Sequence, residues 1–405
     1  MLTPPPPPWD NWDLLAESVG HEPDTPRALA AQKAIQIVRS VLGEDWLKTD
    51  AAQIPSEIAL AFSHTTAFIQ LLELALRLEE FSDVPGAAVL RRTLKKDRRP
   101  DSWKHVELQL ELAALTAAAG ADIAFERGPK DGWPADVVAT HDGTPIPLEA
   151  FSVFTSQEWR AADRASDEIV TRILAPQIHH NLSIVADFHG SVLMPDDLED
   201  WLQRVETAAE DVANDGEPRT ITSGVVSAAI APEEEGPPSS FSGPPIVFSG
   251  WERMLRKLEQ KSLQTSASPN GVWLRVDLLD GIWQFTEWAR YDLAQKLLVL
   301  EGYLRQEFAG AATLAGFIVS TGPAMAHGTF TDEALQSELG SVALRRNLPP
   351  IGVRETLIVP MSDQGSSLVD FLATAYAAEP SSLDRSLQVA GLGTVEEIFP
   401  RQPTS

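Results

Sequence analysis

The sequence contains no cysteine. Disulfides, thiolate zinc sites, iron–sulfur clusters and cysteine nucleophiles are therefore excluded. It also lacks the dinucleotide-binding, P-loop, HExxH and GxSxG motifs, so nothing supports nucleotide-dependent or serine-hydrolase chemistry. The start, MLTPPPPPWDNWD, has neither the basic region nor the apolar stretch of a secretory leader. Together these absences favour a cytoplasmic protein.

Positive charge is also scarce. The 405 residues include 32 basic and 58 acidic side chains, which gives a net charge of −26. A chain this acidic stays soluble and repels nucleic acid and anionic membranes at long range. The longest stretch without a charged residue, 308–331, is interrupted by glycines and predicts a helix end, a buried strand and a loop. We therefore expect no membrane partner.

One short stretch runs against this charge. Residues 91–104 hold seven basic and two acidic residues. A solvated helix end is the simple interpretation. Phosphate contact is the alternative, and nucleic acid would then bind through a basic group at one end of this stretch, although the net charge disfavours it. The group consists of Lys95, Lys96, Arg98 and Arg99. Replacing all four by alanine should abolish any DNA binding.

Composition and length divide the chain into four expected parts. Residues 1–25 form a proline-rich arm that should be disordered. Residues 26–100 have a helical pattern and predict a helical subdomain. Residues 101–330 form the core, with a linker at 232–245 marked by PEEEGPPSSFSGPP. Residues 331–405 form a carboxyl-terminal α/β extension and tail.

Strands alternate with helices along the chain, which is typical of an α/β protein. The expected helices are 28–42, 56–81, 103–119, 156–174, 195–213, 251–264 and 285–308. The expected strands are 121–125, 135–140, 144–153, 182–188, 272–278, 314–320 and 355–359.

The region from residue 103 to residue 153 contains the acidic residues of most interest. Glu107 and Glu111 lie one turn apart on a mostly apolar helix, where they either serve chemistry or reach solvent and Lys104. The Asp142-Gly143 pair is a strong two-residue hairpin signal. That register puts Asp136 opposite Glu149. Facing carboxylates repel unless a cation or a proton lies between them, so the hairpin predicts a divalent-metal site.

The run HVELQLELAALTAAAGADIAFERG…WPADVVATHDGTPIPLEAFSV resembles the core of the PD-(D/E)xK, or restriction-endonuclease-like, nuclease superfamily. The resemblance implies a mixed central sheet flanked by helices. It matches Glu111 to the helix acid, Asp136 to the first strand acid and Glu149 to the second. In that family the two strand acids bind Mg²⁺ and a lysine helps activate the attacking water.

The chain departs from this pattern at the lysine position, where Phe151 stands two residues after Glu149. Some members of the family place the lysine elsewhere. Lys261, on an expected helix that leads into the strand VWLRVD, is then the candidate, ahead of Lys257 and Lys104. A solvated lysine is the alternative for each.

Three functions stay open on these observations. The first is a restriction-endonuclease-like protein with a degenerate active site, weak or inactive as a catalyst, that serves as a binding or regulatory module for a protein partner. The second is a Mg²⁺-dependent nuclease with a relocated lysine. The third is a protein-interaction factor unrelated to nucleases. A Lys261 close to the acid pair favours the second, and a core without a mixed sheet flanked by helices favours the third.

Overall fold

The computed structural model describes most of the chain in two compact units, one of which is inserted into the other. Unit 1 consists of residues 1–154 and 253–405, and unit 2 of residues 155–252. The residues described are 12–13, 25–47, 65–97, 100–125, 135–152, 172–173, 177, 179–188, 195–224, 226–234, 236, 240–242, 255–256, 258–261, 271–278, 292–309, 311, 314–321, 331–348 and 352–399.

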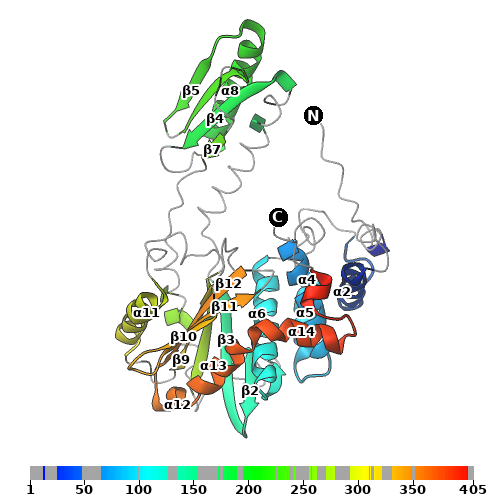
Figure 1. Ribbon diagram of the computed structural model, residues 1–405, viewed down its shortest axis with the longest axis vertical. Coiled ribbons are helices and arrows are strands. Elements are labelled where there is room, and N and C mark those ends of the chain that lie inside the picture. The colour runs from blue at the N-terminus through cyan, green and yellow to red at the C-terminus, as the bar shows by residue number, and fades with distance from the viewer. Residues whose placement is uncertain are drawn as a thin grey trace. The chain divides into compact units, whose positions relative to one another are not determined.

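Unit 1 contains an eight-stranded mixed sheet in the order β1-β2-β3-β8-β9-β12-β11-β10 (Figure 1). Its strands are β1 (Asp122–Phe125), β2 (Val137–His141), β3 (Thr144–Ser152), β8 (Val272–Leu278), β9 (Leu314–Thr321), β10 (Glu333–Gln336), β11 (Val342–Leu348) and β12 (Gly352–Pro360). The pairs β3/β8 and β8/β9 are parallel, and the other neighbours are antiparallel. The expected α/β class with a mixed central sheet flanked by helices is confirmed.

The β2/β3 hairpin has the register that its turn predicts. His141 pairs with Thr144, and the ladder runs to Val137 opposite Leu148. Asp142 and Gly143 both have positive φ, of 49° and 75°, as a two-residue turn of this kind requires.

Helices cover both faces of the sheet. The described helices of unit 1 are α2 (Pro26–Leu42), α4 (Thr65–Glu80), α5 (Ala87–Lys96), α6 (Pro100–Ala118), α11 (Leu293–Glu307), α12 (Asp363–Ser366), α13 (Val369–Ala377), α14 (Glu379–Val389) and α15 (Val395–Ile398). Helices α6 and α13 meet the face that carries Arg275. Helix α11 meets the other face, where Lys296 bonds Glu355.

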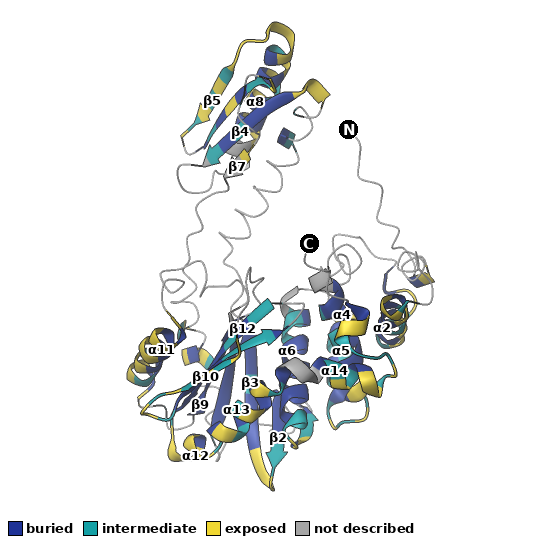
Figure 2. Cartoon of the chain, in the orientation of Figure 1, coloured by how far each residue is buried: buried dark blue, intermediate teal, exposed yellow. Residues whose placement is uncertain are grey.

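The hydrophobic core of unit 1 is continuous from the amino-terminal helices to the sheet. Buried side chains of α2, α4, α5 and α6 form one cluster with side chains of β2, β3, β11 and α13. Figure 2 shows α6 and the central strands almost wholly buried. The segment 26–100 therefore shares its core with the sheet.

Unit 2 has a four-stranded sheet in the order β5-β6-β4-β7 with one long helix. It comprises β4 (Leu182–Phe188), α8 (Pro195–Asp215), β5 (Arg219–Ser223), β6 (Val226–Pro232) and β7 (Ser240–Ser242). Its core is formed by α8 side chains such as Trp201 and by one face of β4 and β6. The unit contains 18 acidic residues, five arginines and no lysine, so it carries −13 of the net charge of −26.

The compact units divide the chain differently from the four expected parts. The segment 331–405 supplies β10, β11 and β12 to the same sheet as β3 and β8. The expected linker at 232–245 includes β7. Nearly all of the expected helix at 156–174 and nearly all of the expected arm at 1–25 lie outside the described residues. Among the described helices, none is both long enough and apolar enough to cross a membrane.

Candidate functional site

The carboxylates of Asp136 and Glu149 both accept hydrogen bonds from backbone N–H groups of the paired segment. The Asp136 N–H donates to Glu149 Oε2 at 3.2 Å, and the Ala150 N–H donates to Asp136 Oδ2 at 2.8 Å. Asp136 lies one residue before β2, and Glu149 lies on the partner strand β3. This reciprocal pairing follows from the hairpin register, and it fixes the two carboxylates relative to each other.

Lys261 contacts Glu149 of this pair. Its Nζ donates to Glu149 Oε1, which bridges 112 residues of sequence. Residues 258–261 are helical, and the Lys261 side chain is 29% exposed. Lys261, the alternative lysine that the sequence analysis singled out, is therefore next to Glu149. Lys257 lies outside the described residues, and Lys104 pairs with Glu107 at 2.9 Å.

Helix α6 adds two side chains that the sequence analysis missed. Gln109 Nε2 donates to Asp136 Oδ1 at 2.9 Å, and His105 Nε2 lies 3.3 Å from the same oxygen. Gln109 Nε2 and His105 Nε2 are 2.9 Å apart. Residues four apart on a helix share a face, so this spacing was the available signal, but nothing in the local sequence linked that face to Asp136.

The charges around the pair shift its ionisation in opposite directions. Burial opposes the charged form of Asp136, but His105, the Ala150 N–H and Lys261 outweigh it and lower the Asp136 pKa. Burial and the neighbouring Asp136 charge raise the pKa of Glu149, although Lys261 opposes them. Burial also disfavours the charged form of His105, but Asp136 outweighs it and raises the His105 pKa. The pair thus contains one firmly ionised carboxylate and one that takes up a proton more readily.

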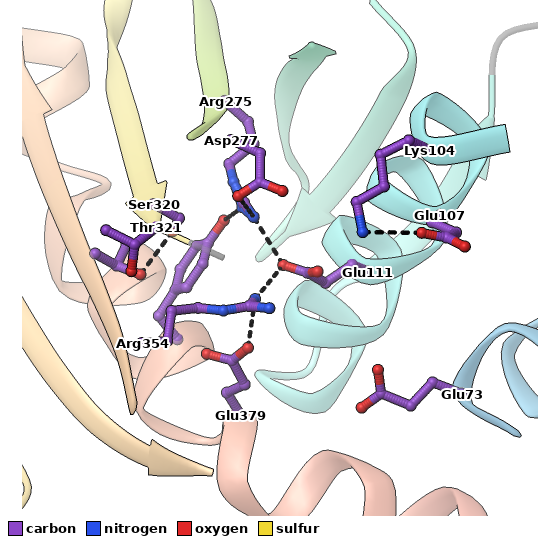
Figure 3. Close-up of polar contacts among 12 residues, drawn as sticks. Glu73, Lys104, Glu107, Glu111, Arg275, Asp277, Ser320, Thr321, Arg354 and Glu379 are labelled. Carbon is purple, nitrogen blue, oxygen red and sulfur yellow. Dashed lines mark hydrogen bonds and ion pairs between the residues drawn. The ribbon is translucent and has the colours of Figure 1, made fainter. Parts of the chain in front are cut away.

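Glu111, matched by resemblance to the helix acid, binds other residues. It lies two residues from Gln109, which places it on a different side of α6 because each residue turns the helix by about 100°. Glu111 Oε1 accepts from Arg275 Nη2 at 2.9 Å and from Arg354 Nη1 at 2.7 Å. Figure 3 shows Glu111 pointing toward these two arginines.

Around Glu111 lies a buried charge cluster, defined here as Glu111, Arg275, Asp277, Arg354, Tyr376 and Glu379. Arg354 Nη1 also contacts Glu379 Oε1 at 2.5 Å (Figure 3). Arg275 Nη1 donates to the Tyr376 hydroxyl at 2.9 Å. Arg275 is fully buried. Buried charges are costly unless they are paired, and within this cluster the pairing is extensive.

The two glutamates of the cluster titrate far apart. Burial opposes the charge of Glu111, but Arg354 and Arg275 outweigh it and lower its pKa to about 2. Burial raises the pKa of Glu379 to about 7, with Arg354 opposing the shift and Glu111 adding to it. Glu379 shares Arg354 with Glu111, whereas Glu111 has two arginines.

The donor set around Asp136 suits a hard cation that keeps part of its water. Within the described part of the chain, no group of three or more histidine, aspartate or glutamate side chains is placed to hold a metal ion. Mg²⁺ does not need one, because it is usually bound through one or two carboxylates together with waters and substrate phosphates. Asp136 and Glu149 fit that requirement.

Two further positions bear on the site. Phe151, at the position where the resembled motif has a lysine, is buried on β3. Lys95 and Lys96 are exposed at the end of α5, directly before the start of α6. Arg98 and Arg99, the other half of the expected basic group, lie outside the described residues.

Comparisons of this chain with protein-family models, with curated proteins and with solved structures find no match.

Proposed function

We propose that this protein is a Mg²⁺-dependent nuclease of the restriction-endonuclease-like type, in which Lys261 takes the place of the usual lysine. One observation carries the proposal: the Lys261 Nζ contacts Glu149 Oε1 across 112 residues of sequence. Phe151 occupies the position where the motif has its lysine. A lysine that only faced solvent would not be expected to contact Glu149, the second acid of that motif.

The order of elements also supports the resemblance. Helix α6 is followed by β1, by the β2/β3 hairpin with its acid pair, and by β8 parallel to β3. This is the helix, strand and hairpin order of the motif, within a mixed sheet flanked by helices. A core without such a sheet would have favoured an interaction factor unrelated to nucleases.

Each side chain has a distinct role in the proposed site. Asp136 and Glu149 would hold Mg²⁺, which when bound stabilises negative charge on a phosphate and lowers the pKa of a bound water. Lys261 favours the ionised form of Glu149. Glu111, deep in the buried charge cluster, has a structural role in this proposal.

Positively charged side chains close in sequence to the site would contact the nucleic-acid partner. Lys95 and Lys96 end α5, and α6 then presents His105 and Gln109 to Asp136. With Arg98 and Arg99 they form the basic group that would contact phosphates.

A second function is favoured by a specific observation. Asp136 already accepts bonds on both carboxylate oxygens, and both oxygens of Glu149 also accept bonds. A site so well satisfied by its own protein is what a retired nuclease that acts as a binding module would retain. The two functions differ in whether a cation displaces any of these contacts.

Cleavage assays with Mg²⁺ or Mn²⁺ on single-stranded DNA, duplex DNA and RNA separate the two functions. The nuclease proposal expects activity that Asp136→Asn and Glu149→Gln abolish and that Lys261→Met reduces by about 10²–10⁴-fold. Lys33→Met is the matched control, because Lys33 forms a similar pair with Glu79 at 2.6 Å, in which both side chains are substantially exposed. Wild-type protein without cleavage and without Mn²⁺ binding would leave the binding module as the function.

A further inference from the structure

The side-chain amide of Gln109 is buried and contacts two side chains of different chemistry. It is 4% exposed, and its Nε2 lies 2.9 Å from both Asp136 Oδ1 and His105 Nε2. The amide is therefore part of the immediate surroundings of the candidate metal site.

The orientation of this amide is determined by its neighbours. With the amide reversed, its oxygen would face Asp136 Oδ1, and two acceptors would meet without a proton between them. The nitrogen must therefore face Asp136. It donates one hydrogen to Asp136 Oδ1, and His105 Nε2 lies 2.9 Å from the same nitrogen.

This orientation leaves the amide oxygen unsatisfied. Gln109 Oε1 is buried and has no hydrogen-bond partner among the described residues. A buried acceptor without a donor costs about 1–3 kcal/mol. The described side chains provide no donor for this oxygen, which belongs to the same amide that bonds Asp136.

We propose that Gln109 is a positioning residue of the metal site: its Nε2 holds Asp136 in place, and its Oε1 accepts a hydrogen bond from a water bound to the cation. The inference rests on the proposed function, because it assumes that Asp136 binds a cation. Partners of this kind orient the ligands of many metal sites, and their loss commonly lowers metal affinity by about 10–100-fold.

The test is the affinity for Mn²⁺, measured by calorimetry on the full chain. Gln109→Met keeps the length of the side chain and removes both polar atoms. The matched control is Gln203→Met, since Gln203 also donates from its amide to a carboxylate, that of Glu199 at 2.9 Å, but belongs to unit 2. We expect a 10–100-fold weaker Kd in the first variant and an unchanged Kd in the second.

Urea unfolding of each variant verifies that the protein used for calorimetry is folded, so that a change in Kd does not merely report lost structure. If Gln109→Met does not fold, Gln109→Asn keeps the amide but is one methylene too short to reach Asp136, and the same loss is expected. Wild-type binding that Asp136→Asn abolishes and the Gln109 variants leave unchanged overturns this inference alone. Absence of binding in the wild type overturns both the inference and the nuclease proposal.

Discussion

The two groups of acidic residues that α6 touches are similarly shielded, but their cationic partners differ in exposure. At one, His105 and Gln109 meet Asp136, whose partner Glu149 contacts the partly exposed Lys261. At the other, Glu111 lies in a cluster whose two arginines are almost completely shielded from solvent. The cationic partners of the first group therefore reach solvent, and those of the second do not.

The comparison distinguishes side chains suited to a reaction from side chains that hold the fold together. Burying each charged side chain of the buried charge cluster costs solvation free energy, which only its ion-pair partners offset. The cluster therefore links α6, β8, β12 and α14. At the acid pair, the partly exposed ammonium of Lys261 and imidazole of His105 lie beside a buried Asp136 and a largely shielded Glu149. Sequence resemblance put Glu111 with the acid pair, whereas its contacts put it with the cluster.

The largest effect is expected from removing Arg354. Arg354→Met leaves Glu111 with one arginine and Glu379 without the guanidinium that it contacts. Removing one partner of a buried ion pair typically costs about 3–5 kcal/mol, so the free energy of unfolding in urea should fall by that amount. An equal loss in Lys33→Met, which breaks an exposed pair, would show that burial is not the reason.

The pH dependence of the free energy of unfolding tests how the buried charge cluster contributes to stability. The folded-state pKa of Glu379 is raised to about 7, so its contribution is fully present below about pH 4.5 and is lost as pH rises toward 7. Glu111 works in the opposite sense: its pKa is lowered to about 2, so its contribution is present above about pH 4.5 and is lost as pH falls toward 2.

Glu379→Gln should therefore flatten the decline in stability between about pH 4.5 and 7 and leave the acid limb unchanged. Chemical denaturation of both proteins at a series of pH values measures this. A variant whose profile runs parallel to the wild type across that window would mean that Glu379 titrates normally in the folded protein.

The acid pair should respond much less in stability. Lys261→Met breaks a contact in which the lysine is 29% exposed. Pairs near the surface are worth about 0–1 kcal/mol, so the urea midpoint should barely move. A loss of several kcal/mol would place Lys261 with the structural ions and weaken the argument for a functional lysine.

The smallest effect on stability is expected at the end of α5. Lys95→Ala with Lys96→Ala alters two exposed side chains, and stability should stay within about 0.5 kcal/mol. If these lysines contact DNA phosphates, the slope of log K against log salt concentration should become shallower by about 2. An unchanged slope in a filter-binding series would exclude them from the interface.

Local pattern predicted much of the fold. The Asp142-Gly143 turn predicted the hairpin register, and apolar periodicity predicted α2, α6, β4, β8 and β9 to within three residues. The strands β5, β6, β7, β10 and β11 were missed. They are short, polar or alanine-rich, as EALQ and VSAAIAP show, and they are strands because neighbouring strands pair with them.

The candidate site was predicted in part for the same reason. Asp136 and Glu149 could be paired because a single turn joins them. Lys261 entered only through the family resemblance, since no periodicity links it to Glu149. His105 and Gln109 could not be found, because the side of α6 that faces Asp136 depends on how the helix packs on β2 and β3.

The insertion of unit 2 has a consequence for how the molecule folds. Strand β3 pairs in parallel with β8, and Leu148 meets Trp273, 125 positions later in the chain. Closing so long a segment costs chain entropy that grows with the logarithm of its length, and contacts this distant in sequence form slowly. An early-folding unit 2 shortens the flexible chain that must be closed. We therefore expect the contact between Lys261 and Glu149 to be among the last to form on refolding, after both units have acquired their sheets.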